Sequence, residues 1–348
     1  MPKITLPPLP RSWSELTWQQ LCLCWDAKMR YGGNADVARV AALLGLLGVS
    51  PCSAAVQTNT GETLYRLRDK DGCRWTVTAR EAAHMARKAL PWFDYPYGDP
   101  GEEAQKDEKG KVVREGRDPV QGYVNPAVAD WRDALVLPIE TLQIGRRWLA
   151  LPQVALNNLT WQQYRSLQAL VPQLFQEDID AAQAVSLQAQ FLSHCLVERS
   201  PALFDTTGGS IRLRPHWEYQ YNAQRAERLA LWLERRLARE LQAAPAPPDG
   251  RHTPLAVLYH ICLQCYQTAM HYYESVYPLL FGGSGKTDPL HTALSGETDT
   301  LNAVMKYAGY TNQQEVYDTN LPFVFGWLNT MAKEAKEVEK MNSKIKRK

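Results

Sequence analysis

Apolar residues recur at every third or fourth position through most of the 348-residue chain, a spacing that places them on one face of an α-helix. Two stretches alternate apolar and polar residues instead, around Asp71-Gly72 and around Gly145. Alternation broken by a glycine turn is typical of a β-hairpin. The pattern therefore predicts a mainly α fold of the α+β class, with small hairpins beside helices at 79–90, 223–242 and 255–280.

The pentapeptide Leu-Thr-Trp-Gln-Gln occurs twice, at residues 16–20 and 159–163. Each copy is followed by a second apolar helix that ends near a Ser-Pro pair, at 50–51 and 200–201. An Arg-Leu-Arg strand and a third helix come next in both copies, with the strands at 66–68 and 212–214. Because the order and spacing agree over a long stretch, we interpret the two copies as a duplicated helix–helix–β-hairpin–helix domain.

The repeated pentapeptide has the chemistry of a helix start. Thr17 with Gln20, and Thr160 with Gln163, fit a capping box, in which the Thr oxygen accepts the N3 amide and Gln reaches back to the cap. Thr78 with Glu81 repeats this device before the third helix of the first copy. We expect the tryptophans of the two copies, Trp18 and Trp161, to lie at equivalent buried positions.

Charged and proline-rich segments divide the chain into parts. Residues 94–127 are rich in Gly, Pro and charge, and such a segment buries too little apolar surface to offset the entropy of ordering. The stretch at 243–250 contains three prolines and is typical of a stiff spacer. The predicted organisation is therefore a first repeat domain at 1–93, an exposed linker at 94–134, a second repeat domain at 135–243, and a C-terminal all-helical section at 251–348.

The last helix of the chain carries one long apolar stripe. Its members step by three or four residues over roughly six turns, while charged Lys and Glu residues cover the other faces. The stripe either folds back on residues 254–281 or lies in a groove on another protein. We favour a partner protein, and we expect the contacts to be made by Phe323, Trp327, Met331, Val338, Met341 and Ile345.

Composition excludes several classes of protein. The net charge of +2 and an apolar content of 45% fit a folded protein that is neither disordered nor strongly basic. The seven cysteines are scattered without a spacing rule, which favours reduced thiols over a secreted disulfide framework. The N-terminal segment has prolines where a signal peptide needs an apolar run, and no apolar stretch is long enough for a membrane span. We therefore expect a cytoplasmic protein with no membrane partner.

The segment LLFGGSGKTDP at 279–289 resembles the end of a phosphate-binding P-loop. A P-loop needs its first glycine five residues before Gly285, and Leu280 stands there. The loop should also follow a strand and open a helix, whereas this segment follows a helical pattern and precedes an Asp-Pro turn. We therefore predict a glycine-rich loop, with no nucleotide or other cofactor.

Other chemistry is weakly supported by the sequence. Cys262 and Cys265 are one helical turn apart near His260 and His271, but no second pair completes a four-ligand zinc site. Nothing resembles a Ser or Cys nucleophile held in an activating turn. Residues 225–240 carry five arginines interleaved with glutamates, as on a salt-bridged surface helix. We predict neither metal binding nor catalysis, and we do not expect nucleic acid as a partner.

The repeated helix starts and the C-terminal sequence from Glu315 to Lys340 resemble proteins of the tail-assembly region of tailed bacteriophages and prophages. Tail assembly chaperones of this kind often end in a Lys/Glu-rich helix that follows a short segment ending in Leu-Pro. The resemblance implies a non-enzymatic assembly protein of the host cell cytoplasm or of the virion. Its implied partners are a tape-measure or tail-tube protein and further copies of the chain as a homo-oligomer. A structural virion adaptor is the alternative within binding proteins, and an enzyme with a dispersed active site is the alternative from another class.

Overall fold

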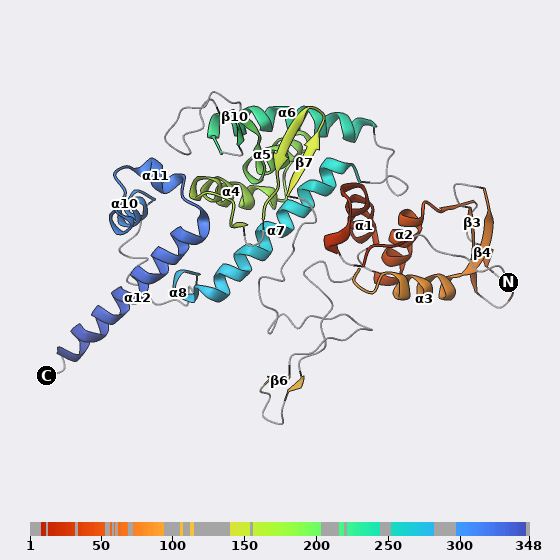
Figure 1. The fold of residues 1–348 in the computed structure, drawn as a ribbon, viewed down its shortest axis with the longest axis horizontal. Coiled ribbons are helices and arrows are strands. Elements are labelled where there is room, and N and C mark those ends of the chain that lie inside the picture. The colour runs from red at the N-terminus through yellow and green to blue at the C-terminus, as the bar shows by residue number, and fades with distance from the viewer. Residues whose placement is uncertain are drawn as a thin grey trace. The chain divides into compact units, whose positions relative to one another are not determined.

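The computed structural model confirms a mainly helical α+β fold with small antiparallel sheets (Figure 1). The chain divides into two compact units, residues 1–139 with 244–258, and residues 140–243 with 259–348. Apart from short gaps at 12, 32–33, 53–55, 58, 60–61, 69–71 and 154–155, the structure describes residues 8–93, 105–106, 112–114, 140–202, 216–218, 221–243, 252–281 and 297–345.

In its described residues the first unit contains three helices, a four-stranded sheet and the start of a further helix. A 3-10 turn, Trp13–Glu15, comes before the helices α1 (Trp18–Tyr31), α2 (Ala35–Leu47) and α3 (Ala79–Ala89). Helix α2 packs against both α1 and α3. In the sheet, β3 (Thr63–Arg68) pairs along one edge with β1 (Ser50–Pro51) and β2 (Val56–Gln57), and along the other with β4 (Arg74–Thr78). A separate short hairpin joins β5 (Gln105–Lys106) and β6 (Val112–Arg114).

The core of the first unit is built from tryptophans. The buried Trp13 ring contacts Trp25, Trp92 and Phe93, with ring centroids 5.4 to 5.7 Å apart. The indole N–H of Trp13 donates to the Trp92 carbonyl at 3.0 Å, so this large ring is buried without losing a hydrogen bond. The segment just before α7 (Pro254–Val276) also bonds to this unit, because both the backbone N–H and the ring of His252 bond to the buried Asp26 carboxylate.

The second unit begins with a hairpin and three packed helices. Strands β7 (Thr141–Ile144) and β8 (Arg147–Ala150) are joined by a two-residue turn in which Gly145 has φ 63°, and β9 (Val197–Glu198) completes the sheet. Helix α5 (Ala181–Cys195) packs against α4 (Trp161–Leu174) and α6 (Ala223–Ala243). Strands β10 (Ser200–Ala202) and β11 (His216–Glu218) pair before α6.

The remaining elements of the second unit in the described ranges are helices. They comprise most of α7 (Pro254–Val276), then α8 (Pro278–Phe281), α10 (Glu297–Ala308), α11 (Gln313–Tyr317) and the long α12 (Leu321–Ile345). The helical pattern predicted at 255–280 is confirmed, with a break between α7 and α8. The segment compared with a P-loop falls largely outside the described residues, from Gly282 to Pro289.

The two copies of the repeat share one order of elements and one way of starting. Both capping boxes form with the same geometry, since the N–H groups of Thr17 and Thr160 each lie 2.9 Å from the Gln oxygen three residues later. The third capping box, Thr78 with Glu81, is also confirmed. Burial coincides at four equivalent places of the first helices, Leu16 with Leu159, Leu21 with Tyr164, Cys24 with Leu167, and Ala27 with Leu170.

The copies differ at the tryptophan that we expected to match. Trp161 is buried, whereas Trp18 is only partly buried, so the expectation of two equivalent buried positions is wrong. The physical reason is local, because Trp13 fills the core of the first unit and Trp161 packs on Tyr164 and Phe325 in the second. The Ser-Pro strand pairs with a later strand in both copies, but the second Arg-Leu-Arg segment lies outside the described residues.

The predicted domain boundaries stay a prediction. The linker expected at 94–134 lies outside the described residues except for the short hairpin at 105–106 and 112–114. The second repeat and most of the C-terminal helices belong to one compact unit. This grouping places α12 in the same unit as α4, which matters for the surface described next.

Candidate protein-binding surface on the last helix

The start of α12 is attached to the start of α4 by a backbone bridge. The N–H of Leu321 donates to the carbonyl of Leu159 at 2.9 Å, and the N–H of Trp161 donates to the carbonyl of Thr319 at 2.8 Å. Thr160 and Asn320 are antiparallel partners in this bridge. The bridge satisfies one of the N–H groups that every helix start leaves without an intrahelical partner. It also fixes the position of the first residues of α12 against the start of α4.

One face of α12 is committed to the interior of the second unit. The Phe325 ring is surrounded by five aromatic rings, and the shortest separation, 4.7 Å between centroids, is to Tyr273. The other four are Trp161, Tyr164, Tyr277 and Phe281, at 5.2 to 6.3 Å. The residues of this face are all buried, namely Leu321, Val324, Phe325, Leu328 and Ala332.

The stripe predicted from the sequence lies on a second face of the same helix. Phe323, Val338 and Met341 have exposed fractions of 62%, 53% and 58%, and Trp327 and Met331 are partly buried. Successive helix residues are about 100° apart, so this stripe is displaced by roughly 120° from the buried face. The side chain of Ile345 lies outside the described residues.

The sequence analysis predicted a single apolar stripe on this helix, whereas the structure has two apolar faces, one buried and one exposed. Packing against residues 254–281 does occur, but it is made by Phe325 and not by the predicted stripe. A signal for the missed face was present, because Leu321, Val324, Leu328 and Ala332 also recur at helical spacing. A helix with two apolar faces serves two neighbours, and the described residues provide only one of them.

The proximal end of the exposed stripe is aromatic. Phe323 and Trp327 have ring centroids 6.3 Å apart, and Trp327 meets Tyr310 edge to face at 5.8 Å. Tyr310 follows α10, and the nearby Tyr307 on α10 is 43% exposed. Rings held in place by one another lose little side-chain freedom on binding, which is why aromatic residues dominate the energetically important parts of protein interfaces.

Beyond Ala332 the helix continues as an arm, which we define as residues 333–345 of α12. Among the side chains described from 333 to 343, none is buried. Figure 1 shows this part of the helix in blue, running on past α8 to the C end. Most of its described charged residues are exposed to water, Lys336 is partly buried, and Val338 and Met341 are exposed.

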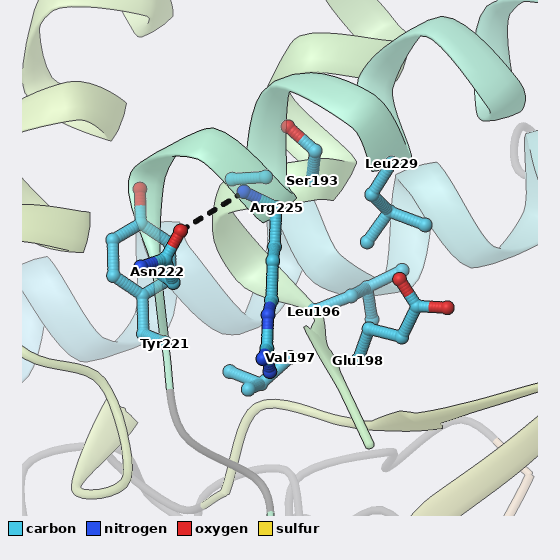
Figure 2. Close-up of a pocket in the computed structure, with 9 residues that line it drawn as sticks. Ser193, Leu196, Val197, Glu198, Tyr221, Asn222, Arg225 and Leu229 are labelled. Atoms are coloured by element: carbon cyan, nitrogen blue, oxygen red, sulfur yellow. Dashed lines mark hydrogen bonds between the residues drawn. The ribbon is translucent and has the colours of Figure 1, made fainter. Parts of the chain in front are cut away.

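A small pocket at the start of α6 is the alternative site (Figure 2). It is lined by residues of α5, β9 and α6, including Ser193, Glu198, Asn222 and Arg225. The backbone N–H of Arg225 donates to the Asn222 side chain, which caps the helix. Glu198 accepts hydrogen bonds from Arg147 through both carboxylate oxygens, so its charge is already balanced. The pocket therefore holds local structural pairs and lacks room for more than a very small ligand.

His194 and Tyr221 lie beside this pocket but are not poised for acid–base chemistry. Nδ1 of His194 and the Tyr221 hydroxyl are 2.7 Å apart. Burial lowers the pKa of His194 to about 4 and raises the pKa of Tyr221 to about 12. General acid–base catalysis works best when the pKa lies near the working pH, and both values lie far from neutrality. The pair is therefore a buried hydrogen bond that links α5 to the segment before α6.

Lys28 in the first unit is the other strongly shifted group. Burial, followed by the neighbouring charge of Arg39, lowers the pKa of Lys28 to about 8. Its ammonium group donates to the Phe93 carbonyl at 3.3 Å and lies over the rings of Phe93 and Trp13, at 5.3 and 5.9 Å. These contacts stabilise the charged form in an aromatic setting. Lys28 is therefore packed as part of the tryptophan-rich core of the first unit.

The cysteines considered as zinc ligands are buried packing groups. Cys262 and Cys265 lie on α7 and are fully enclosed, and burial raises the pKa of both thiols well above the usual range. A metal ligand must be a thiolate, which this environment disfavours. Within the described part of the chain, no group of three or more His, Cys, Asp or Glu residues is arranged to hold a metal ion.

Two findings bear on the class of protein. None of the helices in the described ranges is both long and apolar enough to cross a membrane. No family model, no curated protein and no solved structure shows significant similarity to this chain. Any function therefore has to be argued from the chain's own surfaces, of which the exposed stripe of α12 is the most distinctive.

Proposed function

We propose that the protein is a non-enzymatic assembly protein of a bacteriophage or prophage, similar in role to a tail assembly chaperone. In this proposal the exposed stripe of α12 binds another structural protein, such as a tape-measure or tail-tube protein. The observation that supports the proposal is the second apolar face of α12, which remains uncovered after the first face has packed into the second unit.

The energetic argument rests on the size of the exposed side chains. Burying a Val, Met or Phe side chain contributes roughly 1.5–3 kcal/mol relative to leaving it in water. Phe323, Val338 and Met341 are each more than half exposed, so covering them would release much of this free energy. Apolar residues scattered singly on a surface need no explanation, but a continuous row along one helix marks an interaction site.

The mode of binding follows from the spacing. Phe323, Trp327 and Met331 succeed one another at four-residue intervals and thus form one ridge of the helix. A partner that recognises such a ridge does so with an apolar groove, as in other complexes where an amphipathic helix lies in a groove. Phe323 and Trp327 are the expected anchors, because large aromatic side chains supply most of the binding free energy in such interfaces.

Co-expression tests the proposal. The tagged protein is produced together with candidate tape-measure and tail-tube proteins from the tail region of the same genome, and captured complexes are identified by mass spectrometry. We expect wild-type protein to capture one of them and the double variant Phe323→Ala/Trp327→Ala to lose it. Phe175→Ala is the matched control, because Phe175 is 60% exposed at the end of α4 and lies outside the stripe.

Two results would contradict the proposal. Capture of none of the tail proteins by folded wild-type protein removes the proposed partner class. Equal capture by wild type and by the double variant shows that another surface is responsible. Absence of the protein from purified particles would further favour an assembly role over a permanent virion component.

A further inference from the structure

The outer side of α6 carries a row of arginines. Successive residues of an α-helix are about 100° apart around its axis, so the sequence position gives the side on which a residue lies. Four exposed arginines fall within an arc of about 80° on α6, and we call them the basic row: Arg225, Arg228, Arg235 and Arg239. From its first to its last member, the row is about 21 Å long at 1.5 Å per residue.

The glutamates of α6 lie outside the basic row. By the same geometry Glu227 and Glu234 are at least about 80° from its nearest member. The Glu234 carboxylate accepts a hydrogen bond from the Ser186 hydroxyl on α5 at 3.4 Å, and Glu240 is paired with Arg236 at 3.2 Å. No member of the basic row forms an ion pair with another residue of the described ranges. The positive charge of the row is therefore not balanced by the neighbouring glutamates.

The turn between β7 and β8 packs beside the row. The Arg147 guanidinium lies over the Trp232 ring, 5.1 Å from its centroid, and the Arg236 guanidinium is 5.7 Å from the same centroid. A Cβ atom placed on Gly145 would lie 3.6 Å from the Arg236 guanidinium, so this turn reaches α6. Arg146 in the turn is exposed. The hairpin thus adds a further arginine beside the row and covers part of the Trp232 ring.

We infer that the basic row, together with Arg146, binds the phosphodiester backbone of a double-stranded nucleic acid. The surface uses arginine alone, whose guanidinium donates two parallel hydrogen bonds to one phosphate. A DNA duplex carries one negative charge per about 1.7 Å of its axis, so a row about 21 Å long meets phosphates along its whole length. An acidic protein would need carboxylates placed over the same length, whereas a phosphate backbone supplies them by its repeat.

The binding should not depend on base sequence. Trp232 is partly buried and contacts two guanidinium groups, so its ring is not offered for stacking on a base. Contacts to phosphates carry no sequence information. Nucleic acid was not expected from a chain of net charge +2 with glutamates among these arginines in the sequence. The folded helix places the two charges on different sides, and this separation produces the surface.

Fluorescence anisotropy of the full chain tests the inference with labelled duplexes of about 20 base pairs, which are longer than the row. Two DNA duplexes of unrelated sequence and one RNA duplex are titrated at several salt concentrations. We expect the two DNA sequences to bind equally, with a dissociation constant of roughly 1–100 μM that rises steeply with salt. A preference between the DNA and RNA duplexes identifies which polymer the surface takes.

Two charge-removal variants locate the binding. Arg228→Gln/Arg235→Gln/Arg239→Gln should bind at least about tenfold more weakly, and the slope of log K against log salt should shrink by roughly three. The matched control is Arg74→Gln/Arg80→Gln/Lys88→Gln, which removes the same charge from exposed positions of the first unit. The control should bind within about twofold of wild type, because charges farther than a Debye length are screened.

Wild-type protein that binds neither duplex at about 0.1 M salt and about millimolar concentration overturns the inference. Equal losses in the two triple variants overturn it as well, since the net charge alone would then explain the binding. Polyglutamate of matched charge, titrated in parallel, stands for an acidic protein partner, and tighter binding of polyglutamate than of either duplex also contradicts the inference. The α12 stripe shares no residue with this surface, so tail-protein capture is a separate result.

Discussion

Leu159 and Leu321 are joined across more than 150 residues of sequence by a backbone hydrogen bond of 2.9 Å, and both side chains are fully buried. The first belongs to the repeated helix start, and the second opens the helix that carries the exposed stripe. This bond, together with the one from Trp161 to Thr319, fixes the root of α12 to the second repeat. The proposed binding surface is therefore attached at its base to the second unit, and the arm extends from it.

Phe325 and Phe323 are two residues apart on α12 and should respond oppositely to truncation. Phe325→Ala removes a buried ring from contact with five aromatic neighbours and should destabilise the second unit by about 3–5 kcal/mol. Phe323→Ala removes an exposed ring and should change stability by less than about 0.5 kcal/mol. Urea unfolding followed by circular dichroism measures both. Equal effects would mean that the two faces of α12 have been assigned wrongly.

Truncation after Lys336 should remove most of the arm, from Glu337 onward, without unfolding the protein. This cut keeps Ala332, the last buried residue of the internal face, and removes Val338 and Met341. A cut after Thr330 is less clean, because it also removes Ala332. We expect the melting temperature to stay within a few degrees of the wild-type value for the first cut, as measured by calorimetry. A large fall would show that the arm belongs to the core.

Trp161 and Trp13 provide a comparison of buried indoles. The indole N–H of Trp13 donates to the Trp92 carbonyl, whereas the buried indole N–H of Trp161 has no hydrogen-bond partner among the described residues. An unsatisfied buried donor costs roughly 1–3 kcal/mol. Replacing Trp161 by Phe removes that cost, so Trp161→Phe should destabilise the protein less than Trp13→Phe does, by about 1 kcal/mol or more. Urea unfolding of the two variants decides the order.

His194 should make stability depend on pH between about 6.5 and 4. Burial lowers the pKa of His194 to about 4 in the folded state, below its value in the unfolded chain. The unfolded state therefore binds the proton first as pH falls. This contribution to stability is fully present above about pH 6.5 and is lost progressively toward pH 4, by about 3 kcal/mol in all.

The matched variant is His194→Gln, which keeps a polar group near Tyr221 but cannot titrate. Urea unfolding at a series of pH values should give a shallower decline for the variant than for wild type between pH 6.5 and 4. Parallel curves would show that His194 is solvated and charged in the folded protein.

Features of the fold that depend on neighbouring residues could be predicted from the sequence. The capping boxes at Thr17 and Thr160 involve residues three apart, and the turn at Gly145 needs a positive φ that glycine adopts readily. Both were confirmed. The environment of Trp18 could not be predicted from the sequence. It depends on tertiary packing, which places Trp13 in the core of the first unit.

The candidate site shows the same division. Helical period identified the stripe from Phe323 to Met341, but period alone does not state which of two apolar faces the rest of the chain will cover. In the structure, aromatic side chains from α4, α7 and α8 cover the face that carries Phe325. The partner of the stripe is not encoded in spacing, so it remains a proposal.

Hydrogen exchange of the α12 amides tests the central claim most directly. The measurement is made at low protein concentration, with and without the tail protein that the co-expression experiment identifies. In the free protein, amides of the arm should exchange much faster than those near Phe325, because exposed helix opens locally at low free-energy cost. Addition of the tail protein should slow exchange from Phe323 through the proximal stripe. Unchanged exchange along α12, with protection appearing elsewhere in the chain, would contradict the claim that this helix is the binding surface.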